Sequence, residues 1–152
     1  MKLQKNTLFA LYSVLESAAQ PGRQLSAAEI ARRHRISPHH LAKVLHTLAQ
    51  AGVVESARGV GGGYRFAGNA RRLTLMDVIE LFESMAARKP GAAPARSGSP
   101  QRRRAGGDPG VERAVGRVLE EIDEIAKATF RSISIATMLK LIERERSPAA
   151  RS

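Results

Sequence analysis

A cluster of imidazole and ammonium side chains begins the most chemically distinctive segment of this chain. His39, His40 and Lys43 occupy the first turns of an expected helix, and His46 follows one turn later. These groups donate hydrogen bonds, and near the start of a helix they suit contacts with base edges or phosphate oxygens. The alternatives for the histidines are an ordinary exposed polar face or a capping contact made by His40. The pattern favours a helix that reads nucleic acid.

A glycine-rich turn with flanking arginines follows this helix. Arg58 and Arg65 lie on either side of a run that contains Gly59, Gly61 and Gly62. Glycine lets the backbone approach a phosphate closely, and arginine at a narrow tip suits the minor groove, where negative potential is concentrated. The alternative is an ordinary glycine-rich hairpin with solvated arginines. The run is not a dinucleotide fingerprint, because Tyr64 stands where the last glycine belongs.

Two short helices between residues 26 and 48 must position the histidines. Ser26 and Glu29 fit a capping box that starts the first helix. Ser37 is expected to cap the second helix, and Pro38 suits its first turn. One apolar stripe on the second helix should face the core; it consists of Leu41, Val44, Leu45 and Leu48.

Short elements flank this helix pair. Gly52 should end the second helix in a left-handed conformation, after which residues 53–54 and 65–66 can pair as strands. A helix over residues 3–19 precedes the pair, and another over residues 73–82 follows the hairpin. The predicted apolar face of the first helix consists of Leu8, Leu11, Leu15 and Ala18.

The second half of the chain has a different organisation. Residues 85–109 form a basic linker rich in Arg, Gly, Pro, Ala and Ser, which cannot bury enough surface to offset its ordering entropy and should be disordered. A long helix follows, with apolar residues at alternating steps of four and three. Its seam should form a homodimer interface and consists of Val111, Val115, Val118, Ile122 and Ile125. We therefore expect a DNA-binding domain over residues 1–84, a dimerisation region over 110–146 and a frayed tail over 147–152.

The amino-acid composition limits the classes of partner and cofactor that the chain can bind. Twenty-five Lys and Arg residues against 14 Asp and Glu residues give a net charge of +11, which favours a polyanion, although an arginine-rich proteome would give the same bias. The chain has no cysteine, which excludes disulfides and thiolate metal sites. The histidines lack the spacing of metal ligands, and no enzyme motif is present, so we expect no metal, no cofactor and no catalysis. Without an apolar span or signal peptide, the expected compartment is the cytoplasm.

The run LAQAGVVESARGVGGGY, from Leu48 to Tyr64, closely resembles the end of the recognition helix and the wing of Rrf-type bacterial regulators. That family includes the iron–sulfur-assembly regulator IscR, the nitric-oxide-responsive NsrR and the cysteine-metabolism regulator CymR. The resemblance covers residues 1–83 well and the long helix more loosely. It implies a winged-helix domain, DNA as the partner, and a dimerisation helix that crosses to the second subunit.

The chain departs from this family in one respect. Many members hold an iron–sulfur cluster with three cysteines in the loop before the dimerisation helix, and the corresponding loop here has none. The resemblance therefore does not support cluster sensing, and the chain is similar to the members that lack a cluster.

The sequence thus predicts a mainly α fold: a winged helix-turn-helix with a small β-hairpin wing and a long C-terminal dimerisation helix. The expected function is a homodimeric transcriptional repressor that binds an inverted repeat in double-stranded DNA, with the recognition helix in the major groove and the wing in the minor groove. The alternative is a winged-helix protein-interaction module, and a protein or small-molecule effector is left open. The predicted DNA contacts are Ser37, His39, His40, Lys43, His46, Arg58, Gly59, Gly61, Gly62, Tyr64 and Arg65.

Overall fold

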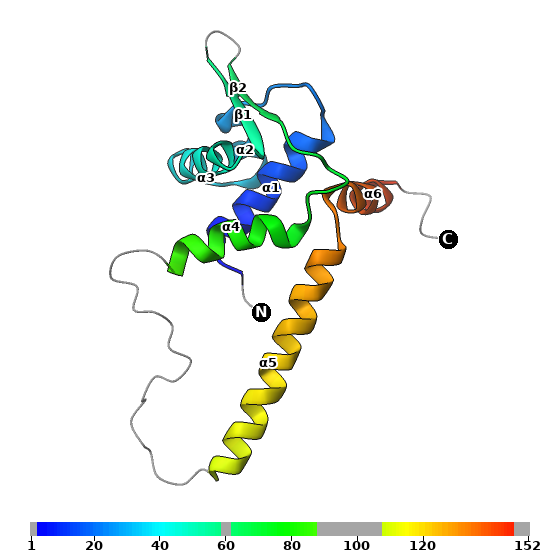
Figure 1. Cartoon of the computed structure of the whole chain (residues 1–152). Helices are drawn as coiled ribbons and strands as arrows, with labels where there is room; N and C mark the ends of the chain where they lie inside the picture. Colours follow the sequence, from blue (N-terminus) through cyan, green and yellow to red (C-terminus); the bar gives the residue numbers. More distant parts are fainter. Residues whose placement is uncertain (1–2, 59–61, 88–107, 148–152) are drawn as a thin grey trace.

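The computed structural model describes residues 3–58, 62–87 and 108–147. These residues form a mainly helical fold with one β-hairpin, as predicted (Figure 1). In chain order the elements are α1 (Lys5–Ala19), α2 (Ala27–His34), α3 (Pro38–Gln50), β1 (Val54–Ala57), β2 (Gly63–Phe66), α4 (Leu75–Ala87), α5 (Pro109–Ser132) and α6 (Ile135–Arg146). Helix α4 continues past the expected domain boundary at residue 84. Most of the predicted linker, like the tip of the hairpin, lies outside the described residues.

The core lies where α1, α3 and α4 meet. The predicted apolar stripe of α3 is fully buried, which confirms the period that was inferred for this helix. Helix α4 contributes a similar face, which consists of Leu75, Met76, Val78, Ile79 and Phe82. This packing leaves the opposite face of α3 free for solvent or a partner.

The predicted apolar face of α1 is confirmed in part: Leu11 and Ala18 are buried, but the buried surface is wider than predicted. Leu8 and Leu15 are only half-buried, whereas the fully covered positions centre on Val14 and include Ser13 and Ser17. Each serine hydroxyl donates to the carbonyl oxygen four residues earlier, at 2.8 Å, so it can be buried without losing a hydrogen bond. Because α1 contacts α3, α4, α6 and the hairpin, more than one of its faces is covered.

The hairpin is fixed to the helical core through Leu25. Strands β1 and β2 pair antiparallel, with Val54 opposite Phe66. The backbones of Leu25 and Tyr64 exchange two hydrogen bonds of 2.8 Å, which form an isolated antiparallel β-bridge beside β2. A Cβ atom on Gly63 would lie 2.6 Å from the carbonyl oxygen of Leu25, so this β-bridge requires glycine at position 63.

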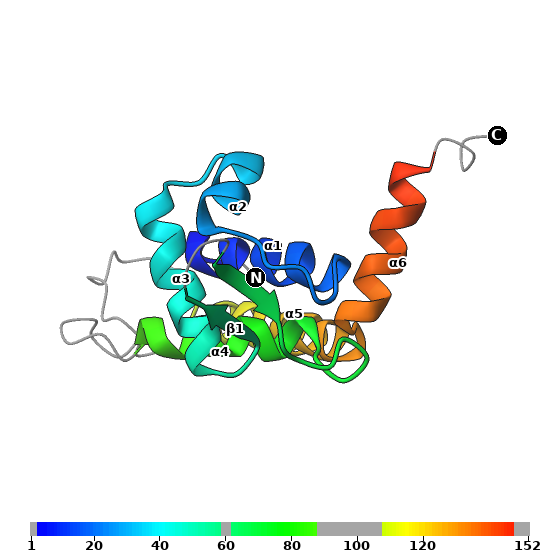
Figure 2. The same ribbon diagram turned by 90° about the horizontal axis from the view of Figure 1, so that it is seen from above.

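Helices α5 and α6 join the domain at one corner. The Leu75 amide donates to the Ile133 carbonyl at 2.9 Å, and the Ile135 amide donates to the Leu73 carbonyl at 2.8 Å. These bonds hold the α5–α6 turn against the start of α4. From this corner α5 projects away from the domain, while α6 lies beside α1 (Figures 1 and 2). No helix in the described ranges is long and apolar enough to cross a membrane.

Candidate nucleic-acid interface

The junction between α2 and α3 determines how the second helix is presented. The predicted capping box is confirmed: the Glu29 amide donates to Ser26 Oγ at 3.1 Å, and the Ser26 amide donates to Glu29 Oε2 at 2.9 Å. The backbone hydrogen bond from Ser26 is the main cause that holds the pKa of Glu29 below its ordinary value of 4.5. Helix α2 then ends at Arg35, which adopts a left-handed conformation with φ of 53°. The chain turns sharply there and enters α3 at Ser37.

The exposed face of α3 carries the predicted recognition residues. His39, His40, Lys43 and His46 are all exposed, opposite the buried stripe, and α3 contains no acidic residue. The rings of His39 and His40 lie 6.2 Å apart and are tilted by 54°. Within the described part of the chain, His40 makes no capping hydrogen bond. The first turns of α3 therefore present an uninterrupted set of donors.

Ser37 differs from its predicted role. It occupies the N-cap position of α3, but its side chain accepts no hydrogen bond from the first turn. Pro38 suits the first helical position because it has no amide hydrogen to satisfy there, whereas the donors that a cap would satisfy are the amides of His39 and His40. The Ser37 hydroxyl is exposed at the tip of the helix.

The two arginines in the described part of the wing differ in their ion pairing. Arg58 is exposed at the end of β1. Arg65 on β2 lies opposite Glu55 on β1, and its Nε and Nη2 atoms donate to Glu55 Oε2 at 3.0 and 2.8 Å. A phosphate would have to compete with Glu55 for Arg65. Both groups are about half-exposed, so this surface pair is weak and can exchange partners.

The predicted glycine and tyrosine contacts of the wing also differ from one another in their surroundings. Gly59 and Gly61 lie outside the described residues, whereas Gly62 is half-buried before β2. The Tyr64 backbone forms the β-bridge to Leu25, and the Tyr64 side chain packs partly against the core. Tyr64 therefore anchors the wing, and Gly63, which was not among the predicted contacts, permits the anchor. Strand β1 contacts α3, which brings the hairpin beside this helix (Figure 2).

Sequence reasoning missed a contact behind the α2–α3 junction. Glu16 on α1 accepts a hydrogen bond from Arg33 Nη1 at 2.7 Å, and its other oxygen lies 3.2 Å from His34 Nε2. The His34 ring stacks on Tyr12, with centroids 4.9 Å apart and planes inclined by 13°. We call this contact the Glu16 clamp; it joins the end of α2 to α1. Its residues come from separate helices, so no periodic pattern in the sequence reveals it.

The seam of α5 is uncovered in the single chain. No residue of α5 is buried, and the five predicted seam residues together with Leu119 are between 52% and 60% exposed. Apolar side chains in such a continuous line favour a partner surface.

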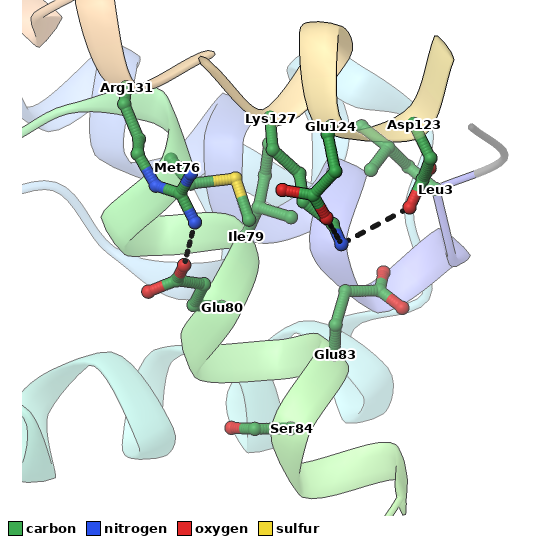
Figure 3. A pocket seen from close by; sticks show the side chains of 10 residues that line it. All are labelled: Leu3, Met76, Ile79, Glu80, Glu83, Ser84, Asp123, Glu124, Lys127 and Arg131. Carbon is green, nitrogen blue, oxygen red and sulfur yellow. Dashed lines mark hydrogen bonds and ion pairs between the residues drawn. The ribbon is translucent and has the colours of Figure 1, made fainter. Parts of the chain in front are cut away.

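A groove of about 720 Å³ separates the second half of α5 from α4 (Figure 3). Lys127 binds Asp123 at 3.2 Å and Glu124 at 2.8 Å, and the Glu124 hydrogen bond is the main cause that raises the Lys127 pKa. Arg131 binds Glu80 at 3.4 Å. Since both cations are paired, the groove keeps an excess of acidic groups beside the seam.

The residues present do not suit an iron centre. Cysteine is absent from the whole sequence, and in the three described segments no His, Asp and Glu side chains gather as a set of three metal ligands. Thiolates are the usual ligands of iron–sulfur clusters.

The model of the Rrf2 family, described as iron-dependent transcriptional regulators, matches residues 3–141. The chain belongs to the Rrf2 family. A Rhodopseudomonas palustris protein designated HTH-type transcriptional regulator BadM is 48% identical over 99% of this chain and 89% of its own length. NsrR of Bacillus subtilis is 36% identical over 55% of this chain and 58% of its own.

Solved Rrf2 structures share the fold. IscR from T. potens superposes with a TM-score of 0.69 at 24% identity, covering 97% of this chain and 92% of that one. The oxidised form of Staphylococcus aureus CymR gives 0.68 at 18% identity, covering 91% and 96%. The predicted family resemblance is confirmed. This Rrf2 protein is a DNA-binding transcriptional regulator and not an enzyme.

Proposed function

We propose that this Rrf2 protein is a homodimeric repressor that binds an inverted-repeat operator through α3 and the wing. The observation that carries the proposal is the exposed face of α3, where His39, His40 and Lys43 stand opposite a fully buried stripe with no acidic neighbour on the helix. Residues near the start of such a helix read base edges in the major groove. Arg58 and Arg65 on the adjoining wing supply phosphate or minor-groove contacts.

The exposed seam of α5 supports the dimer. A two-fold axis places two recognition helices on one side of the assembly, and the operator then repeats as an inverted pair of half-sites. Because the chain has no thiolate, a cysteine-held cluster does not fit as its signal, and a protein or small-molecule effector is left open. Such a regulator works on the chromosome, which places it in the cytoplasm.

The test begins with genomic fragments that co-purify with the protein, from which an operator is identified. Each variant is then titrated against the operator, a mismatched operator and random duplex at one salt concentration. His39→Ala and Lys43→Ala should cost about 1–3 kcal/mol on the operator and change the preferred sequence. Arg58→Ala should weaken all three duplexes by similar factors, because phosphate contacts carry no sequence information.

Lys140→Ala is the matched control, since Lys140 is an exposed cation on α6, away from α3 and the wing. It should leave all three affinities unchanged. If the α3 variants weaken every duplex equally, α3 is not the reader. If no genomic fragment binds more tightly than random duplex, the protein-interaction module is the better description.

A further inference from the structure

A second cleft lies between α1, α2 and α6, apart from the predicted DNA contacts and the α5 seam. Its volume is about 540 Å³, within the range of about 300–1,000 Å³ that is typical of small-molecule sites. Leu15, Met138, Leu139 and Ile142 line it and are only half-buried, so apolar surface remains available inside the cleft. Helix α6 contacts α1, and Figure 2 shows its ribbon apart from that of α2.

Two guanidinium groups in the lining of the cleft, those of Arg33 and Arg146, can bind an anion. Both oxygens of Glu16 already face partners, Arg33 and His34. Arg33 uses one nitrogen for Glu16, and a guanidinium carries five N–H donors, so it can bind a second acceptor. Arg146 on α6 adds another guanidinium to the lining. The carboxylates of the lining are Glu16, which is bound to Arg33, and Glu143, which is exposed on α6.

The apolar and charged groups lie in line along α6. Leu139, Ile142, Glu143 and Arg146 stand at positions i, i+3, i+4 and i+7, which places them on one face of the helix. At 1.5 Å per residue, the axial distance from Leu139 to Arg146 is about 10 Å. An extended chain of eight carbons has a similar length. The cleft thus matches a molecule with an apolar chain and a terminal anion.

We propose that this cleft binds a small amphipathic carboxylate, with its chain along α6 and its carboxylate at Arg33 and Arg146. Arg33 also belongs to the Glu16 clamp, which holds the end of α2 directly before the turn at Arg35. A ligand carboxylate bound to the remaining donors of Arg33 shares the guanidinium charge with Glu16, so the contact between Arg33 and Glu16 weakens and α2 loosens from α1. Binding therefore weakens the presentation of α3 to DNA, a step that rests on the proposed function.

Binding is tested by calorimetry on the full-length protein, with octanoate as the probe and octanamide as its uncharged analogue. Octanoate should bind with a dissociation constant of about 0.1–1 mM, and octanamide at least about tenfold more weakly, since it lacks the charge-assisted contacts. Leu139→Trp should fill the cleft and abolish binding. Leu141→Trp is the matched control, because Leu141 is exposed on the same helix but does not line the cleft.

Arg146→Gln provides a second variant at an exposed position that the fold does not need. It should weaken octanoate about tenfold and leave octanamide unchanged. The proposal is wrong if octanoate gives no heat at about 10 mM, if Leu139→Trp binds as the wild type does, or if octanamide binds equally well.

The regulatory step is tested by fluorescence anisotropy on operator DNA with and without saturating octanoate. Octanoate should weaken operator binding by about tenfold in the wild type and have no effect in Leu139→Trp. Unchanged operator affinity in the octanoate-bound wild type overturns this step and leaves the binding site in place. Absence of operator binding without octanoate contradicts the proposed function and the regulatory step together, whereas the calorimetry still decides the site.

Discussion

Replacing Ile122 with aspartate should separate the proposed homodimer while each subunit stays folded. Ile122 lies in the middle of the α5 seam and is 53% exposed in the single chain. Since α5 contributes no buried residue, the substitution leaves the core of the domain intact.

The size of the effect follows from exposure and symmetry. Full burial of an isoleucine side chain is worth about 1.5–3 kcal/mol, so covering the exposed half contributes about 1 kcal/mol. A two-fold dimer contains the residue twice, and each aspartate adds a cost of roughly 1 kcal/mol or more for an unpaired carboxylate in the interface. The total loss of about 4 kcal/mol raises the dimer dissociation constant by about a thousandfold.

Sedimentation equilibrium over a range of protein concentrations measures this constant, and circular dichroism checks that the variant is folded. Leu141→Asp is the control, because it places the same charge on an exposed apolar position of α6. A wild-type protein that sediments as a monomer at micromolar concentration would refute the reasoning. An Ile122→Asp variant that dimerises as well as the wild type would show that the interface lies elsewhere.

Three further predictions concern the turn, the capping box and iron. Arg35→Gly should raise the free energy of unfolding in urea by up to about 1 kcal/mol and Arg35→Val should lower it by about 1–2 kcal/mol, because glycine alone adopts positive φ without strain; equal effects would contradict this. Because folding lowers the pKa of Glu29, its ionised carboxylate stabilises the folded protein at pH values above the ordinary pKa of 4.5. This stabilisation is lost as the pH falls through the pKa of Glu29 in the folded protein. Glu29→Gln should therefore make the urea midpoint less dependent on pH below about 4.5. The purified protein should be colourless, and a strong iron chelator should leave operator affinity unchanged; near-stoichiometric iron and sulfide after anaerobic purification would show that non-cysteine ligands hold a cluster.

Local patterns were sufficient to predict the central elements of the fold. The stripe of α3, the capping box at Ser26 and the left-handed Gly52, with φ of 77°, each depend on residues within a turn or two of one another. Short-range periodicity and capping chemistry fix such features before any tertiary contact forms.

Features that depend on packing between elements were not predictable in this way. The buried line of α1 depends on the neighbours that surround it, and the pairing of Arg65 with Glu55 depends on the register of the hairpin. The Glu16 clamp requires α1 and α2 to be placed before its residues can meet. Whether His39, His40 and Lys43 read bases stays a prediction, because their exposure is compatible with a solvated face as well.

The corner where α5 and α6 meet α4 turns the long helix into a lever. Three backbone hydrogen bonds hold its base, and its 24 residues extend about 36 Å from that point. A rotation of about 5° at the base moves the far end by about 3 Å, close to the rise of one DNA base pair. In a dimer joined through α5, a rotation of a few degrees at this corner is therefore large enough to shift one DNA-binding domain by about one base pair relative to the other.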